Sequence, residues 1–139
     1  MPTPKVLVKF NSLYPKATAV FWHEKRLPDS VQRVDFDCNC QEGIGHLVIT
    51  FDTTGGILEK DILVSVKYLP GNILNYIENN YPNGFKYGDI DKINDNSGGI
   101  SYQVTLLQTN PDGDILSGGW TYILKFKASG EYISVEKRE

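Results

Sequence analysis

The sequence has no long apolar run and no run of basic residues. Its longest apolar stretches, such as Ile62-Leu63-Val64, are far shorter than the ~20 residues that cross a bilayer, and Met1-Pro2-Thr3-Pro4 lacks the charged n-region and following apolar segment of a signal peptide. Fourteen basic and seventeen acidic residues give a formal net charge of -3 without any cluster suited to a phosphate backbone. We therefore expect no membrane insertion and no nucleic-acid partner, while the compartment stays open.

Cysteine and histidine are scarce. Cys38 and Cys40 form a C-x-C pair, and on one strand their Cα atoms would lie about 6.6 Å apart with parallel side chains, which does not suit a disulfide. A zinc site would need His23 and His46, but no C-x₂-C or H-x₃₋₅-H spacing brings the four together. We expect Cys38 in the core, Cys40 as a thiol at the strand end, and neither metal nor cofactor.

Familiar cofactor and catalytic motifs are missing as well. Gly43-Ile44-Gly45-His46 lacks the third glycine of a dinucleotide fingerprint, and a strand is expected where that motif needs a helix. The stretch 110–114 has alternating oxygen side chains, but Ile115 stands where an EF-hand requires glycine, so a plain turn is expected. The chain contains no G-x-S-x-G, H-E-x-x-H or P-loop pattern. These absences favour a non-enzymatic domain.

What the sequence does contain suits one globular domain over residues 1–139. A chain of this length buries roughly 68% of its unfolded surface and needs no disulfide or metal to stabilise a core. Hydrophobic residues make up 40% and charged residues 22%, which is ordinary, and an aromatic content of 12% favours strands.

An internal repeat organises the chain. After Thr3-Pro4, apolar residues recur at helical spacing until Tyr14-Pro15, and a second such run follows Leu69-Pro70 and ends at Tyr81-Pro82. The apolar positions are Val6, Phe10 and Leu13 in the first run, and Ile73 and Ile77 in the second, with Asn80 at the same spacing. The two Tyr-Pro pairs are offset by 67 residues. Two similar helices are therefore expected.

Segments of alternating polarity follow each predicted helix. In the first copy these sets are Val34, Phe36 and Cys38, then Leu47, Ile49 and Phe51; in the second they are Ile100, Tyr102, Val104 and Leu106, then Trp120, Tyr122, Leu124 and Phe126. In the first copy Arg33, Asp35 and Asp37 share the opposite, polar face. Each set predicts a half-buried antiparallel strand.

The hairpin turns repeat too, and they locate a difference between the copies. Residues 51–55 match residues 126–130, and each segment ends in a glycine suited to a tight hairpin. This offset is 75 residues, so the second copy is longer, and the turn-rich stretch 110–119 is the expected insertion. We expect an α+β fold of two repeats, about 4–68 and 69–139, joined into one curved antiparallel sheet with both helices on one face.

The order of these motifs resembles the PepSY-like family. The resemblance rests on the helix, the first Tyr-Pro, a strand with Trp22, the Val34-Asp35-Phe36 strand, Phe51-Asp52-x-x-Gly55, Leu69-Pro70 and the second Tyr-Pro. It implies a fold similar to the β-lactamase-inhibitor protein, a periplasmic or secreted location, and an inhibitory or regulatory binding role. It supplies no catalytic residues.

The leading hypothesis is a non-enzymatic binding domain that contacts a protein partner. It would use the open face of the sheet and the loop at 110–119, because large aromatic rings dominate interfaces. The candidate contact residues are Trp22, Tyr87, Trp120, Asp112 and Asp114.

Two alternatives remain open at this stage. The first is a small-ligand or signal-sensing domain, in which Trp22, Tyr87 and Trp120 line a pocket between sheet and helices. The second is a structural domain that self-associates through an edge strand. The sequence does not define the oligomeric state or the identity of a partner.

Overall fold

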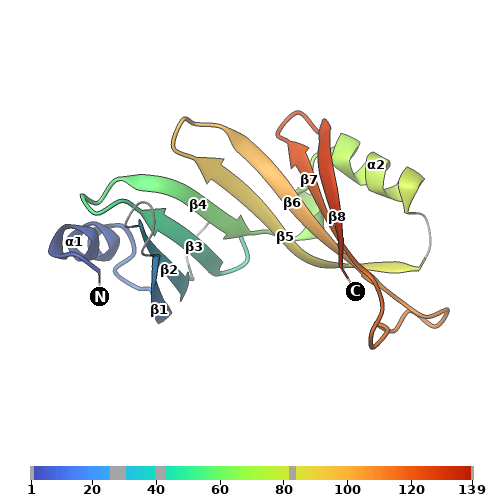
Figure 1. Cartoon of the computed structure of the whole chain (residues 1–139), viewed down its shortest axis with the longest axis horizontal. Helices are drawn as coiled ribbons and strands as arrows, with labels where there is room; N and C mark the ends of the chain where they lie inside the picture. The colour runs from blue at the N-terminus through green and yellow to red at the C-terminus, as the bar shows by residue number, and fades with distance from the viewer. Residues whose placement is uncertain (1, 26–30, 40–42, 82–83, 139) are drawn as a thin grey trace. The chain divides into compact units, whose positions relative to one another are not determined.

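The computed structural model describes residues 2–25, 31–39, 43–81 and 84–138, and within them each long helix precedes four strands (Figure 1). The elements are α1 (Pro4–Leu13), β1 (Thr18–Lys25), β2 (Val31–Asp37), β3 (His46–Phe51), β4 (Ile57–Leu63), a 3-10 turn (Val66–Tyr68), α2 (Gly71–Asn80), β5 (Phe85–Asp95), β6 (Ile100–Gln108), β7 (Thr121–Lys127) and β8 (Tyr132–Arg138). The strands are ordered β1 to β8 in one sheet, and the pairs within β1–β4 and β6–β8 are antiparallel. The predicted α+β class is confirmed.

The chain divides into two compact units. Unit 1 comprises Met1–Leu63 and Ile93–Gly99, and unit 2 comprises Val64–Lys92 and Ile100–Glu139. The boundary therefore falls a few residues before the expected repeat boundary, and the return of 93–99 to unit 1 was not anticipated. The curvature of the sheet and a common face for both helices stay predictions.

Helix α1 begins and ends where the sequence indicates. The Thr3 side chain caps it by accepting a hydrogen bond from the Val6 N–H at 3.3 Å. Val6 and Phe10 are buried, whereas Leu13, expected on the same apolar face, is 43% exposed in the last turn. The Tyr14 N–H bonds to the Phe10 carbonyl and closes the helix.

Helix α2 ends like α1 but begins differently. The expectation that Leu69-Pro70 opens this helix in the same way as Thr3-Pro4 is wrong, because Pro70 itself is the N-cap and its ring has no oxygen to accept a hydrogen bond. Ile73 and Ile77 are buried as expected. At the other end, the Tyr81 cap has φ −133° and ψ 60°, close to the −133° and 67° of the α1 cap.

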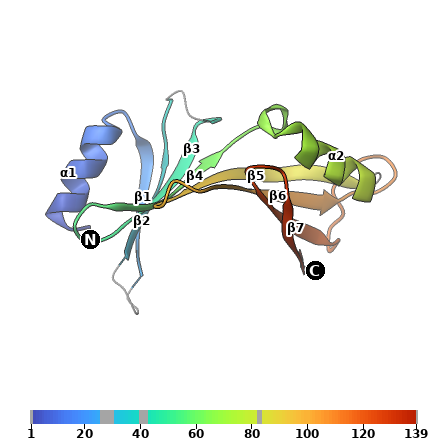
Figure 2. The same cartoon turned by 90° about the horizontal axis from the view of Figure 1, so that it is seen from above.

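In unit 1, α1 covers one face of the strands (Figure 2). The two predicted apolar sets of β2 and β3 are buried, as expected: Val34, Phe36, Cys38, Leu47, Ile49 and Phe51. The Phe10 ring of α1 lies 4.9 Å from Phe36 and 5.3 Å from Trp22, measured between centroids. The face that carries Arg33 and Asp35 is therefore the one that α1 leaves open.

In unit 2, the predicted alternation holds in the middle of the strands and fails at their ends. Val104, Leu106, Leu124 and Phe126 are buried. Ile100 is 38% exposed at the first position of β6, and Trp120 lies one residue before β7. Strand ends have neighbours on fewer sides, so alternation there does not ensure burial.

Four five-residue hairpin turns share one hydrogen-bond pattern. In each turn the first residue's N–H bonds to the carbonyl of the fifth, and the fourth residue's N–H bonds to the carbonyl of the first. The turns are 52–56, 95–99, 110–114 and 127–131. Gly55 and Gly130, the predicted turn glycines, have φ of 93° and 91°. The predicted long loop lies between β6 and β7.

Each helix contacts a hairpin turn of its own unit in a similar way. A Cβ added at Gly55 would lie 3.3 Å from the Lys5 carbonyl oxygen, and one at Gly130 would overlap the Asn72 side chain. The Asn72 amide also donates a hydrogen bond to the Ser129 carbonyl. These shared details agree with two related units, although descent from one repeated copy stays a prediction.

Candidate functional site

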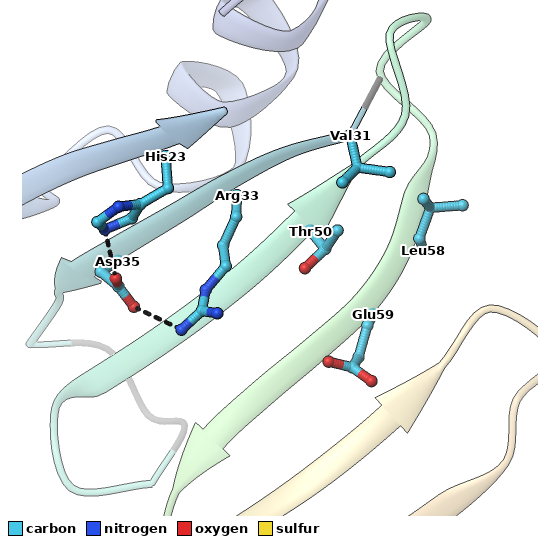
Figure 3. Close-up of a pocket in the computed structure, with 7 residues that line it drawn as sticks. All are labelled: His23, Val31, Arg33, Asp35, Thr50, Leu58 and Glu59. Atoms are coloured by element: carbon cyan, nitrogen blue, oxygen red, sulfur yellow. Dashed lines mark ion pairs between the residues drawn. The ribbon is translucent and has the colours of Figure 1, made fainter. Parts of the chain in front are cut away.

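A pocket of about 650 Å³ lies on the open face of unit 1 (Figure 3). Its lining residues come from β1, β2, β3 and β4: His23, Val31, Arg33, Asp35, Thr50, Leu58 and Glu59. This volume lies within the range of sites that hold a small molecule or an inserted side chain.

Strand register builds the pocket from residues that are far apart in the sequence. Arg33 on β2 pairs with His23 on β1 and with Thr50 on β3, and Thr50 pairs with Glu59 on β4. The four side chains therefore form one row across the strands. Adjacent strands lie about 4.8 Å apart, so the small Thr50 leaves a hollow between the longer Arg33 and Glu59.

A β-bulge in β4 adds an apolar wall. Phe51 pairs with Ile57 and Thr50 with Glu59, so Leu58 is the extra residue of the bulge. A bulge re-aims side chains, which explains how the consecutive residues Leu58 and Glu59 both line the pocket.

The charged residues of the pocket differ in how they are paired. The His23 Nε2 lies 2.9 Å from an Asp35 carboxylate oxygen, and the Arg33 guanidinium lies 4.0 Å from the other (Figure 3). The Asp35 side chain is only 23% exposed, whereas those of His23 and Arg33 are 58% and 55% exposed. The half-buried Glu59 carboxylate has neither ion pair nor hydrogen bond among the described residues.

An exposed aromatic ring lies on the same face of the sheet. Phe21 pairs with Asp35 and is 65% exposed. Phe21 comes directly after an irregular segment of β1 in which the pairing register shifts. This segment contains Ala19, which has a positive φ of 50° although it is not a glycine. Such strained backbone persists where surrounding structure holds it, often at functional surfaces.

The strand positions of His23 and Thr50 do not place a general base beside the pocket hydroxyl. The Asp35 carboxylate contacts the His23 ring, as in sites where a carboxylate orients a histidine that acts as a general base. The Thr50 hydroxyl lines the same pocket and is a group of the kind that acts as a nucleophile. Two strand spacings, about 9.6 Å, separate the Thr50 backbone from that of His23. Activation of a hydroxyl requires the base within about 3 Å, so this geometry does not pair them.

The predicted contact residue Trp22 lies on the helix-facing side of unit 1. Its ring centroid is 5.3 Å from that of Phe10 and 6.4 Å from that of Phe51. Trp22 is half-buried, so part of it stays accessible at this edge. Its role in partner binding stays a prediction.

Tyr87 and Trp120 belong to unit 2, whereas Trp22 belongs to unit 1. Lys137 Nζ lies 3.7 Å from the Trp120 ring centroid, which is a close cation–π contact. Tyr87 is half-buried, and desolvation, followed by the nearby Glu78, raises the pKa of its hydroxyl above the ordinary 10.0. The three aromatic candidates therefore lie in two different units, and each stays a prediction as a contact residue.

Asp112 and Asp114 lie in the exposed loop between β6 and β7. Their N–H groups each donate a 3.0 Å hydrogen bond to the Asn110 side-chain oxygen, which identifies the stretch as an ordered turn. Within the described residues no group of three His, Cys, Asp or Glu side chains is placed to hold a metal. Cys38 is 6% exposed, as expected for a core residue, and Cys40 lies outside the described residues.

None of the residues that line the pocket was predicted as a site residue. The alternation of β2 did place Arg33 and Asp35 on the polar face, but exposed charges in strands are common and do not indicate a pocket. The informative signal is the row of four side chains, which becomes visible only when strand register is known.

Comparisons with known proteins identify the fold. No family model and no curated protein matches the chain significantly. A candidate periplasmic protein from Bacteroides eggerthii is 12% identical with a TM-score of 0.76, and the match covers 99% of this chain and 89% of that one. A DUF2874 family protein from Bacteroides uniformis is 16% identical with a TM-score of 0.75, covering 99% and 90%.

A third solved structure carries a more specific description. A BLIP-like protein, resembling the β-lactamase-inhibitor protein, from Bacteroides fragilis is 21% identical with a TM-score of 0.67, covering 99% of this chain and 86% of that one. The chain therefore has the β-lactamase-inhibitor-like α+β fold. Among the described elements, neither α1 nor α2 has the length and apolarity needed to span a bilayer.

Proposed function

We propose that this protein is a non-enzymatic binding module that contacts a protein partner through the open face of unit 1. The observation that carries the proposal is the pocket between Arg33 and Glu59, which occupies a sheet face that α1 does not cover. Exposed Phe21 beside it adds the kind of aromatic ring that dominates interface energies.

The fold supports this proposal and its setting. The proposal includes membership of the PepSY-like family and an inhibitory or regulatory role, which the BLIP-like neighbour supports. It also includes a periplasmic or secreted location, which the candidate periplasmic neighbour supports. The loop with Asp112 and Asp114 remains a second candidate contact region in unit 2. The partner itself is defined below by the chemistry of the chain's own residues.

Small-ligand binding is the second candidate function. The pocket volume of about 650 Å³ favours it, because drug-sized molecules occupy sites of roughly 300–1,000 Å³. Unlike the pocket expected from the sequence, this one lies on the open face and is not lined by Trp22, Tyr87 or Trp120. Because the pocket lies on an uncovered sheet face, we favour a protein partner, which can cover the face and also fill the pocket.

Site-specific photo-crosslinking tests the proposal. A benzoylphenylalanine at Phe21 is expected to capture one protein from an extract of the source organism, and the same group at Val8, 70% exposed on α1, is expected to capture none. Excess wild-type chain should abolish the capture, whereas excess Phe21→Asp chain should not. Binding is then measured with the purified captured protein.

Two outcomes would contradict the proposal. Equal capture from Phe21 and Val8 would show that the reaction reports exposure rather than a specific surface. A captured protein that binds the wild-type and Phe21→Asp chains with equal affinity would show that another face makes the contact.

A further inference from the structure

We infer that the pocket of unit 1 accepts a lysine side chain of the partner protein. This inference rests on the proposed function and specifies the chemistry of its central contact. It follows from a pocket carboxylate, that of Glu59, which has no ion pair among the described residues, from the apolar walls near it, and from the residue that occupies the position of Thr50 in unit 2.

The first argument is electrostatic. One positive charge, on Arg33, and two negative charges, on Asp35 and Glu59, line the pocket when His23 is neutral. Asp35 has both His23 and Arg33 beside it, so the Glu59 carboxylate is the group left without a counter-ion among the described residues. Glu59 is half-buried, which strengthens its attraction for a cation relative to a fully solvated carboxylate.

The second argument concerns shape and polarity. Val31 and Leu58 line the pocket together with Glu59. A lysine has four methylene groups below its ammonium, and such a stem packs on apolar surface while the charged end reaches a polar group. The Thr50 hydroxyl, paired in register with Glu59, offers the ammonium a second acceptor.

The third argument comes from the corresponding row of unit 2. Phe126 pairs with Tyr102 and Tyr132 as Phe51 pairs with Gln32 and Ile57, and each hairpin has a register shift at this point.

One residue further from the turn, Lys125 stands in the place of Thr50, between Gln103 and Ser134. Unit 2 thus carries its own lysine at the position that is hollow in unit 1. Ser134 takes the place of Glu59 in unit 2, so a lysine supplied by a partner would occupy the position of Lys125 and meet, in Glu59, a carboxylate that unit 2 lacks there.

The test is a titration of the whole chain with Nα-acetyl-L-lysine methylamide, followed by backbone amide resonances. We expect saturable shifts at Val31, Thr50 and Glu59. The matched probe Nα-acetyl-L-norleucine methylamide has the same stem without the charge and is expected to bind about tenfold or more weakly. Added salt should weaken the binding of the lysine probe but not that of the norleucine probe.

Two variants of the chain complete the test. Glu59→Gln keeps the size of the side chain and should weaken lysine-probe binding about tenfold or more. Thr50→Lys copies the residue of unit 2 and should abolish binding by filling the hollow. Well-dispersed spectra of both variants establish that they are folded.

The inference is overturned if the norleucine probe binds as well as the lysine probe, if Nα-acetyl-L-glutamate methylamide binds more tightly, or if Glu59→Gln changes nothing. These results are separable from failure of the proposed function. Specific capture at Phe21 without lysine-probe binding would retain the protein partner and reject the lysine. Lysine-probe binding without specific capture would retain the pocket chemistry and reject the protein partner.

Discussion

At the scale of single residues, one side-chain oxygen organises each of three hairpin turns. Oδ1 of Asp52 accepts hydrogen bonds from the N–H groups two and four residues ahead, and Asp95 does the same. Asn110 makes the equivalent pair in the loop between β6 and β7. An uncharged amide oxygen therefore accepts the same two backbone hydrogen bonds as a carboxylate, so the geometry of the turn does not require the charge.

Replacing Asp52 with Asn should change how stability depends on pH. The Thr54 hydroxyl, and then the Gly56 N–H, lower the pKa of Asp52 from its ordinary 3.8, because they donate to the charged form. The folded chain thus holds this proton less tightly than the unfolded chain. The stabilisation is present above pH 3.8 and is lost as the pH falls through the lower folded-state pKa.

We therefore expect the melting temperature of the wild type to exceed that of Asp52→Asn at about pH 6 and to converge on it at about pH 2. Thermal unfolding followed by circular dichroism measures the difference. Asp112→Asn is the control, because the Asp112 carboxylate makes no hydrogen bond among the described residues. A difference that is constant with pH would contradict the assignment.

At the scale of elements, a turn glycine serves two purposes in the β7–β8 hairpin. Gly130 has φ of 91°, which side-chain-bearing residues rarely adopt, and its Cα lies against the Asn72 side chain of α2. Hairpin formation and helix docking therefore depend on the same missing Cβ.

Gly130→Ala should lower the free energy of unfolding by about 2 kcal/mol, of which about 1–2 kcal/mol is the cost of the left-handed backbone. Gly71→Ala is the matched control in the same unit. No atom would lie within 4 Å of its added Cβ, and its φ is not in the left-handed range, so stability should be unchanged or rise by up to about 1 kcal/mol. Urea denaturation compares the two, and equal stabilities would refute the argument.

At the scale of the whole molecule, strand β5 belongs to both compact units. Residues 85–92 of this strand lie in unit 2, and residues 93–95 lie in unit 1. Loss of this strand removes part of each unit. We therefore expect the units to unfold together, even though each has its own buried core.

A core truncation in unit 1 tests this expectation. Phe36 is fully buried against Phe10 and Tyr14, so Phe36→Ala should cost about 3–5 kcal/mol. The two tryptophans lie in different units, so Trp120→Phe and Trp22→Phe backgrounds each leave one fluorescent reporter.

Both reporters should show one transition at the same denaturant concentration, and Phe36→Ala should shift both by the same amount. Val8→Ala, at a position 70% exposed, should change the free energy of unfolding by no more than about 0.5 kcal/mol. A shift seen by Trp22 alone would show that the units unfold independently.

Much of the fold was predictable because its causes are local or periodic. Thr3 caps the first helix, the Tyr14 and Tyr81 positions end both helices, and alternating residues such as Val34 and Phe36 mark the buried face of a strand. Each prediction depends on residues within one turn or one strand. The same reasoning failed at Ile100, where a strand end has fewer neighbours to bury the side chain, and at the start of α2, where Pro70 is the N-cap and has no side-chain acceptor.

The sequence by itself therefore determined the α+β class, most helix and strand positions, and the long loop between β6 and β7. Only the tertiary structure decided the candidate site. His23, Arg33, Thr50 and Glu59 meet because strand register aligns positions up to 36 residues apart, and a bulge turns Leu58 toward them. A tight turn such as 52–56 sets the register of the two strands that it joins, but alignment of the whole row also depends on pairing across β1, β2 and β3, which alternating polarity does not specify.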